Sequence, residues 1–196
     1  MREIWKTAIA LFVICVITTG AMAFTYMGTK DTIIERALID EENARREVLA
    51  DAEKFEEISD LSAITASNPT YSIVKKAFKG LKGDTVIGYV FTIDSKGYGG
   101  DIRIIVGVDN DGKVTRVKVG DNKETPGLGA KASQEPFISQ FTNLAATGPL
   151  QVVKNGSTKP EEIDAISGAT ITSRAVVKAV QAAIDMTSEL TAKGGK

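Results

Sequence analysis

The chain has 196 residues and a formal net charge of −1, with one Cys and no His. The absence of His excludes a Ser-His-Asp triad, a His-ligated zinc site and a His general base. The single Cys excludes an intramolecular disulfide, a four-cysteine cluster and a CxxC redox pair. The near-neutral charge argues against a nucleic-acid partner. We predict no metal site, so any redox chemistry needs a cofactor other than haem or an iron–sulfur cluster.

The acidic and basic residues divide the chain into three parts. Residues 1–30 have a net charge of +2, residues 31–60 contain 11 acidic and 4 basic side chains, and residues 61–196 have a net charge of +4. We expect these parts to be a membrane anchor over residues 1–30, an acidic helix over residues 31–61 and one folded domain over residues 62–196.

An uncharged stretch over residues 7–29 predicts a transmembrane helix. Its 23 residues would form a helix of about 35 Å, and the hydrocarbon core of a membrane requires about 20 residues. Trp5 and Tyr26 lie near its ends, where aromatic rings prefer the membrane interface. Ala21-Met22-Ala23 resembles a cleavage site, but the apolar run is longer than in a typical signal peptide. We therefore predict a single-pass anchor in membrane lipid, with Cys15 as a small apolar residue of its helix.

The flanking charges predict the orientation of this anchor. Arg2 and Lys6 precede the span, and Lys30 and Arg36 follow soon after it. The count of basic residues is balanced, and the very short N-terminal tail favours a cytoplasmic N-terminus. We expect the anchor to lie in a cell membrane and the chain after Tyr26 to lie outside the cytoplasm.

The acidic part is predicted to be helical. Its apolar residues recur at spacings of three, four and seven, which is typical of an amphipathic helix, and it contains no Gly or Pro. The helix either continues the membrane helix or bends from it, and it spaces or docks the domain. The alternative is a partner-binding helix in a membrane complex.

Short β-like runs follow a break at Asn68-Pro69. Strands are predicted over residues 71–74, 85–93, 101–108, 114–119 and 150–153. Residues 109–112 predict a hairpin turn, since the later ligands of a calcium loop are absent, and Asn155-Gly156 predicts another turn. Helices are predicted over residues 133–141 and 172–190, the second with a buried stripe of Val176, Val177, Val180, Ala183, Ile184 and Leu190. The expected fold class is α+β, with a mainly antiparallel sheet and a C-terminal helix.

The segment before the last helix carries the first motif, Asp164-Ala165-Ile166-Ser167-Gly168-Ala169-Thr170. Its small residues allow a tight turn, and hydroxyl groups gather at the helix N-terminus on Thr170, Thr172 and Ser173. Free N–H groups and the positive end of the helix dipole suit a phosphate at such a place. From the residues alone, the alternative is plain N-capping by Thr172 or Ser173.

The second motif is Glu124-Thr125-Pro126-Gly127-Leu128-Gly129-Ala130-Lys131. It predicts a tight turn with Gly127 at the position that needs a positive φ. Gly129 leaves room for a ligand, and Lys131 offers a cation. The alternative is a surface loop that only turns the chain. A third connection, Gly97-Tyr98-Gly99-Gly100, permits close approach of the backbone.

Together these residues resemble the FMN-binding domain found in the G subunit of the Rnf electron-transport complex. Asp-x-x-Ser-Gly-Ala-Thr looks like the flavinylation motif of that family, and the Glu-Thr-Pro-Gly-Leu-Gly and Gly-Tyr-Gly-Gly loops are similar to other parts of its domain. The layout of one membrane helix before an extracytoplasmic domain also fits, so the resemblance covers nearly the whole chain. The C subunit of the sodium-translocating NADH:quinone reductase shares the motif and is the alternative, although the compact length favours the Rnf family.

The resemblance implies one FMN per chain, attached covalently through its phosphate, as a phosphoester, to Thr170. A flavin transferase would install it during maturation and read Asp164, Ser167, Gly168, Ala169 and Thr170. Around the phosphate we expect Ser167, Gly168, Ala169, Thr172 and Ser173, of which Thr172 and Ser173 would donate hydrogen bonds. Near the flavin ring we expect Glu124, Thr125, Gly127, Leu128 and Gly129, with Leu128 packed against it.

One position departs from the family pattern. The family often has a His two residues before Glu124, where this chain has Asn122, which cannot change charge near neutral pH. Lys123 and Lys131 are the candidates for stabilising negative charge on the flavin.

The implied function is that of an electron carrier. Its FMN would pass single electrons between redox centres of other membrane and peripheral subunits, in a complex that couples ferredoxin and NAD to ion movement. The chain has no G-x-G-x-x-G motif after a predicted strand, which argues against NAD binding. Its apolar span has no acidic or basic side chain that could form a path for ions. The alternatives are a membrane-anchored binding module without flavin and a reductase that acts on soluble acceptors.

Overall fold

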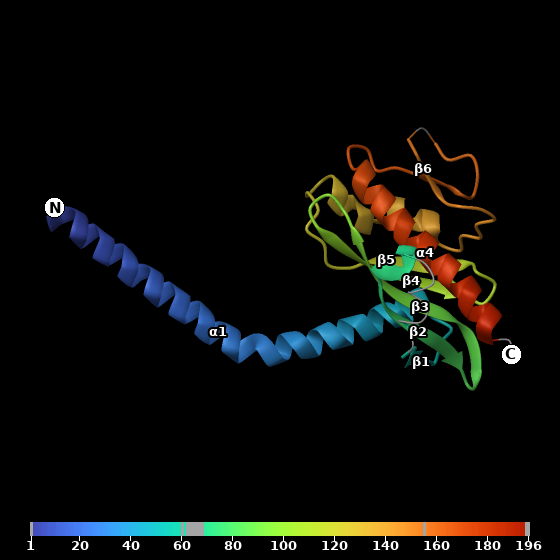
Figure 1. Cartoon of the computed structure of the whole chain (residues 1–196), viewed down its shortest axis with the longest axis horizontal. Coiled ribbons are helices and arrows are strands. Elements are labelled where there is room, and N and C mark those ends of the chain that lie inside the picture. Colours follow the sequence, from blue (N-terminus) through green and yellow to red (C-terminus); the bar gives the residue numbers. More distant parts are fainter. Residues whose placement is uncertain (1, 60, 62–68, 155, 195–196) are drawn as a thin grey trace. The chain divides into compact units, whose positions relative to one another are not determined.

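A computed structural model describes residues 2–59, 61, 69–154 and 156–194. The chain forms two compact units, Met1–Asn43 and Ala44–Lys196. The first unit is helical, and the second combines a β-sheet with a long helix (Figure 1).

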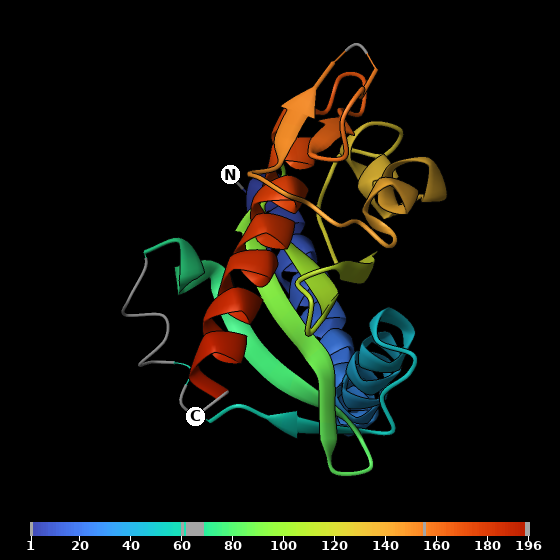
Figure 2. The same ribbon diagram turned by 90° about the vertical axis from the view of Figure 1, so that its right-hand side faces the viewer.

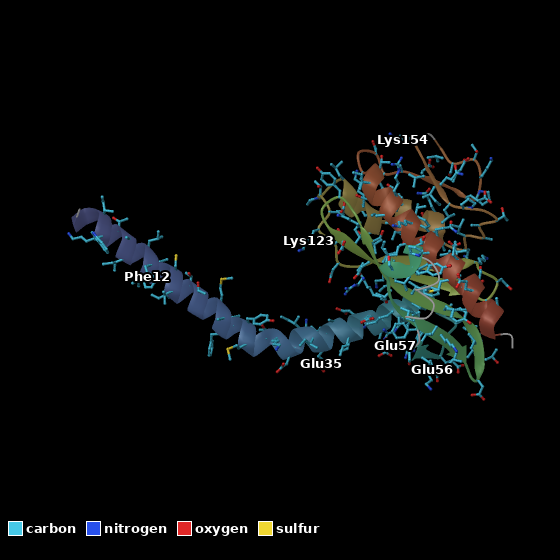
Figure 3. The ribbon with its side chains drawn as sticks, viewed as in Figure 1. Phe12, Glu35, Glu56, Glu57, Lys123 and Lys154 are labelled. Atoms are coloured by element: carbon cyan, nitrogen blue, oxygen red, sulfur yellow. The ribbon has the colours of Figure 1, made fainter. Side chains whose placement is uncertain are left out.

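Helix α1 spans Arg2–Val48 and supplies the first unit. Among the described residues it is the one helix that is long and apolar enough to cross a membrane, and an 18-residue stretch of it has a mean hydropathy of 2.2. The large apolar side chains that α1 contributes to the first unit are exposed, and Figure 3 shows Phe12 projecting from the helix. The hydroxyls of Thr18 and Thr25 donate to the carbonyls of Ile14 and Ala21, both at 2.9 Å. These polar groups are therefore satisfied within the helix, as a lipid environment requires.

The second unit is built on a five-stranded antiparallel sheet. Its strands are neighbours in chain order: β1 (Lys54–Glu57), β2 (Val74–Lys82), β3 (Thr85–Lys96), β4 (Asp101–Asp109) and β5 (Val114–Val119). Two short strands, β6 (Gln151–Val153) and β7 (Glu162–Asp164), pair in parallel. Over residues 69–154 and 156–194, the helical elements are η1 (Pro69–Ile73), η2 (Gly129–Ser133), α3 (Glu135–Ile138), η3 (Ser139–Phe141) and the long α4 (Thr170–Gly194).

Both faces of the sheet carry apolar residues because both are covered. On one face, α4 lies across β3 and β4, as Figures 1 and 2 show. Phe91 and Ile93 of β3 are buried there with Val176 of α4. Successive side chains of a strand point to opposite faces, so Val90 lies in a second cluster, with Phe78.

The second face is covered by the end of α1 and the turn after it, which belong to the second unit. A Cβ on Gly107 would lie 2.3 Å from the carbonyl oxygen of Val48, and one on Gly80 would lie 2.4 Å from Leu49 Cδ2. These two glycines therefore allow the segment to approach the sheet backbone closely. The hydroxyl of Thr115 donates to the carbonyl of Val48, where α1 ends.

Several predicted elements are confirmed. The strands predicted over 85–93, 101–108 and 114–119 correspond to β3, β4 and β5, the strand over 150–153 corresponds to β6, and the last helix corresponds to α4 with its predicted stripe, of which Ile184 is only partly buried. The hairpin turn is present as well. Gly112 has a φ of 80°, and Asp109 Oδ1 accepts the N–H groups of Asp111 and Lys113 at 3.0 and 2.9 Å.

Other predictions differ from the structure. Residues 71–74 are not a strand but lie mostly in η1, and the strand that follows, β2, was missed because four lysines obscure its apolar pattern. The segment 133–141 is not one regular helix: it begins at the last residue of η2 and continues as the short elements α3 and η3. Strand β7 was missed because of its length.

The acidic helix expected over residues 31–61 is shorter than predicted. It ends at Val48, and residues 54–57 pair with β2 as strand β1. The open edge of β2 satisfies the backbone groups of these residues, and this tertiary pairing outweighs their helical spacing. The compact unit that contains the sheet begins at Ala44. The predicted break at Asn68 and the turn at Asn155 involve residues outside those described.

Candidate functional site

Three segments that are distant in the sequence meet at one cavity of about 570 Å³ in the second unit. They are the 97–100 loop, the 124–129 loop and the start of α4 with the turn before it. The lining consists of Tyr98, Glu124, Thr125, Leu128, Gly129, Gly168, Ala169, Thr170, Ile171 and Thr172. Residues of both motifs predicted from the sequence therefore line the same cavity.

Glu124 joins the three segments through one buried carboxylate. The residue is only 7% exposed. Its Oε1 accepts the backbone N–H groups of Tyr98 at 2.9 Å and Gly99 at 2.8 Å, and its Oε2 accepts the hydroxyl of Thr172. A buried carboxylate is costly unless such donors surround it. The 97–100 loop and the first turn of α4 are thus held to the same side chain.

Two glycines make this arrangement possible. A Cβ on Gly129 would lie 2.3 Å from Glu124 Oε2 and 2.8 Å from Thr172 Oγ1. We expected Gly129 to leave room for a ligand. In the structure, the hydrogen-bonded side chains of Glu124 and Thr172 lie in the space beside it. A Cβ on Gly99 would lie 2.1 Å from the carbonyl oxygen of Lys123, so this glycine is also required by close packing.

The turn of the second motif has the predicted geometry. Gly127 has a φ of 79°, and the N–H groups of Leu128 and Ala130 donate to the carbonyl of Thr125 at 3.1 and 3.2 Å. A Cβ on Gly168 would lie 3.1 Å from Leu128 Cδ2. The tips of the two motifs are therefore in close proximity.

Thr170 lies where α4 begins, partly exposed on the cavity wall. The first N–H groups of a helix have no carbonyl partner within the helix, and the helix dipole is positive at that end. An anionic group bound to Thr170 would therefore lie at the favourable end of a 25-residue helix.

The neighbouring hydroxyls form hydrogen bonds within the protein. Thr172 donates to Glu124, while the fully buried Ser173 donates to the carbonyl of Ala169 and accepts the N–H of Ile166, both at 3.0 Å. A hydroxyl group has one hydrogen to donate. In this arrangement these two side chains stabilise the turn before α4 rather than present donors to a phosphate.

A second cavity, of about 370 Å³, takes the remaining motif residues. Asp164, Ser167 and Lys131 line it and do not line the cavity of Thr170. Gln140 holds this segment in place, because its side chain accepts the N–H of Asp164 at 2.7 Å and donates to the carbonyl of Asp164 at 3.3 Å. Lys123 is exposed and points away from the domain in Figure 3, so neither predicted cation lines the first cavity.

Asn122 shapes the loop that leads to Glu124. Its Oδ1 accepts the N–H of Glu124 at 3.2 Å, and its Nδ2 donates to the carbonyl of Gly120 at 3.1 Å. The side chain of Asn122 thus stabilises this loop, at the position that departs from the family pattern described above. Across the described ranges, no group of three or more His, Cys, Asp or Glu side chains is arranged to hold a metal ion.

Two surface carboxylates organise the segment that leads to the first motif. The hydroxyl of Thr147 is the main group that lowers the pKa of Glu161 below its ordinary value. The backbone N–H and then the hydroxyl of Thr158 lower the pKa of Glu162 in the same way. Both carboxylates are therefore charged and bonded at neutral pH, on either side of the start of β7.

Comparisons with known proteins agree with this architecture. A family model for the FMN-binding domain matches residues 97–185, which include all three loops of the cavity, and one for the RnfG N-terminal region matches residues 1–48. Over 186 residues the chain is 35% identical to the G subunit of the proton-translocating ferredoxin:NAD(+) oxidoreductase complex of Clostridium ljungdahlii, covering 95% of this chain and 91% of that protein. The chain belongs to the RnfG family.

Other members and more distant structures extend this result. The G subunit of the Na(+)-translocating ferredoxin:NAD(+) oxidoreductase complex of Acetobacterium woodii is 36% identical over 199 residues, covering 97% of this chain and 94% of that protein. Crystal structures of Shewanella oneidensis NqrC and of the C subunit of Na(+)-translocating NADH-quinone reductase from Parabacteroides distasonis both give a TM-score of 0.52. The first is 23% identical and covers 60% of this chain and 61% of that one; the second is 19% identical and covers 71% and 78%. These two structures confirm the α+β fold that was predicted for this chain.

Tyr98 and Ile171 line the cavity, although neither was among the predicted site residues. The sequence offered one signal for each of them. Tyr98 lies between the glycines of the 97–100 loop, and Ile171 lies between Thr170 and Thr172. Their orientation into the cavity depends on how these segments pack together.

Proposed function

We propose that this RnfG protein carries one FMN, attached through its phosphate as a phosphoester to Thr170. The observation that carries the proposal is the single cavity that brings Thr170 together with the 124–129 loop. The match of an FMN-binding domain over the same residues supports it.

The residues around the cavity fit a phosphorylated flavin. The volume of about 570 Å³ lies in the range of about 300–1,000 Å³ that is typical of ligand sites. Leu128 and Ile171 would pack against the ring, and backbone groups of Thr125 and Gly129 would meet its polar edge. A phosphoester at Thr170 keeps a negative charge, which the start of α4 stabilises. When bound, FMN supplies one-electron transfer.

The proposed role is that of an electron relay within a membrane complex. The relatives are named as subunits of ferredoxin:NAD(+) oxidoreductase complexes that translocate protons or Na(+). In this chain the residues bind and orient the flavin, and other membrane and peripheral subunits would bind ferredoxin and NAD and move the ion. The chain alone would then show little activity with soluble acceptors.

The second candidate is the NqrC protein of a sodium-translocating NADH:quinone reductase, because solved members of that group share the fold. Identities of 35% and 36% to RnfG relatives, against 23% and 19% to these structures, favour a role in an Rnf complex. The alternative of a membrane-anchored binding module without flavin predicts that the purified protein is colourless.

The attachment is tested by flavin fluorescence in a denaturing gel. The wild-type chain, produced with its flavin transferase, should give a fluorescent band. Thr170→Ala should give none, whereas Thr142→Ala, which alters an exposed threonine away from the cavity, should match the wild type. A fluorescent Thr170→Ala band would refute the attachment to Thr170.

Recognition by the transferase is a separate proposal. Ser167 and Gly168 are exposed, and Asp164 lines the neighbouring cavity with Ser167, so an enzyme can reach these residues from outside. Asp164→Ala should lower the fluorescence of the band while the circular dichroism spectrum stays unchanged. Full flavin loading of that variant would remove Asp164 from the recognition motif.

We also propose that α1 crosses the cell membrane with the N-terminus in the cytoplasm and the flavin domain outside. Cys15 is the one cysteine of the chain, so a Cys15→Ala, Thr142→Cys variant carries a single thiol on the domain. A membrane-impermeant maleimide added to intact cells, with the outer membrane permeabilised where there is one, should label it. Labelling only after lysis would show the opposite orientation.

A further inference from the structure

We propose that the aromatic ring of Tyr98 forms one wall of the flavin site and stacks on the isoalloxazine ring, and that Glu124 positions it there. This inference rests on the proposed function, since it assigns a residue to the FMN site. Tyr98 is the residue that the 97–100 loop contributes to the cavity lining.

The exposure of Tyr98 is the first observation. It is 72% exposed, and the two other large apolar side chains of the cavity, Leu128 and Ile171, are 43% and 54% exposed. Among the described residues of the second unit, the other aromatic side chains are buried, as Tyr71 and Tyr89 are, or partly buried, as Phe55 is. An exposed aromatic ring beside two exposed aliphatic side chains at one cavity forms a surface that a planar, largely apolar ligand would cover.

The rigidity of the loop beneath the ring is the second observation. The N–H groups of Tyr98 and Gly99 both donate to Glu124 Oε1, at 2.9 and 2.8 Å, and the N–H of Gly97 donates to the carbonyl of Gly100 at 2.8 Å. With this backbone held, only the two side-chain torsions of Tyr98 remain to place its ring. Glu124 therefore acts as a positioning residue for Tyr98, through the backbone of its loop.

Stacking of a phenol on a flavin has a spectroscopic consequence. The phenol ring gives an electron to the photoexcited flavin and receives it back, so the fluorescence is quenched and no net reaction occurs. The readout is therefore the flavin fluorescence of the native protein divided by that of the same sample after denaturation. This ratio does not depend on how much flavin is attached.

The test uses the full-length chain, purified in detergent after production with its transferase. Tyr98→Leu removes the ring, and its fluorescence ratio should rise severalfold over the wild type. Tyr98→Phe keeps a ring that is much harder to oxidise, so its ratio should rise as well, and it decides the question if Tyr98→Leu does not load flavin. Tyr98→Trp supplies a stronger electron donor and should remain quenched.

The matched control is Tyr26→Leu, the same exchange at an exposed tyrosine of α1, which should leave the ratio unchanged. A ratio equal to the wild type in Tyr98→Leu, or in Tyr98→Phe where the Leu variant does not load, would overturn the stacking. Absence of a fluorescent band from the denatured wild type would instead contradict the proposed FMN attachment, so the two failures are distinguishable.

Discussion

Replacement of Glu124 by Ala tests whether this carboxylate holds the site together. The change removes two backbone hydrogen bonds of the 97–100 loop and the acceptor of the Thr172 hydroxyl. Tyr98 and Gly99 are exposed residues, so water can replace their partner, and each bond should contribute about 0.5–1 kcal/mol. Thr172 is 1% exposed, and an unsatisfied buried hydroxyl costs about 1–2 kcal/mol.

These contributions predict a loss of about 2–4 kcal/mol in the free energy of unfolding for Glu124→Ala. For a domain of this size, 1 kcal/mol lowers Tm by about 2–4 °C, so we expect a decrease of about 4–16 °C. Glu124→Gln keeps an oxygen for both N–H groups, and its amide can donate to the Thr172 hydroxyl, which then becomes an acceptor. Its loss should therefore be smaller than that of Glu124→Ala.

The assay is thermal unfolding of the full-length chain in detergent, followed by circular dichroism. Glu57→Ala is the control, because it removes an exposed carboxylate from the edge strand β1 (Figure 3) and should change stability by less than about 0.5 kcal/mol. If Glu124→Ala unfolds at the same temperature as Glu57→Ala, Glu124 does not join the three segments and the reasoning fails.

Three further variants address other contacts. Gly129→Ala places a Cβ 2.3 Å from Glu124 Oε2 and should lower the free energy of unfolding by about 1–3 kcal/mol; a Tm equal to that of the wild type would contradict this close packing. Gly107→Ala should displace the Val48 carbonyl and speed amide hydrogen exchange at the end of α1, and unchanged exchange would argue against that docking. Burial raises the pKa of Tyr89 above 10.0, so above pH 10 the unfolded chain loses a proton that the folded chain keeps, and stability should fall with rising pH until the folded pKa is passed. Tyr89→Phe should lack this contribution in denaturant titrations, and an identical pH profile would count against it.

Features that depend on neighbouring residues follow from the sequence alone. An uncharged run of sufficient length predicts the membrane helix, a β-like run predicts β3, alternation predicts β4 and β5, and residues 109–112 predict the hairpin between those two strands. The paired motifs are enough to indicate the family and to single out Thr170 as the expected attachment residue. Each of these signals is local, because a helix, a hairpin or a short motif is specified within a few turns of chain.

Which distant residues meet depends instead on the tertiary fold. Residues 54–57 have a helical spacing, yet they form β1 because they pair with the edge of β2 and because Phe55 packs against the cluster that contains Phe78. Glu124 was predicted to lie near the flavin ring, and only the fold shows that its buried carboxylate accepts hydrogen bonds from two other segments. The fold also places Lys131 on a different cavity from Thr170. Hydrogen bonds between residues 25 to 48 positions apart depend on how the sheet and α4 pack. No local pattern in the sequence encodes that packing.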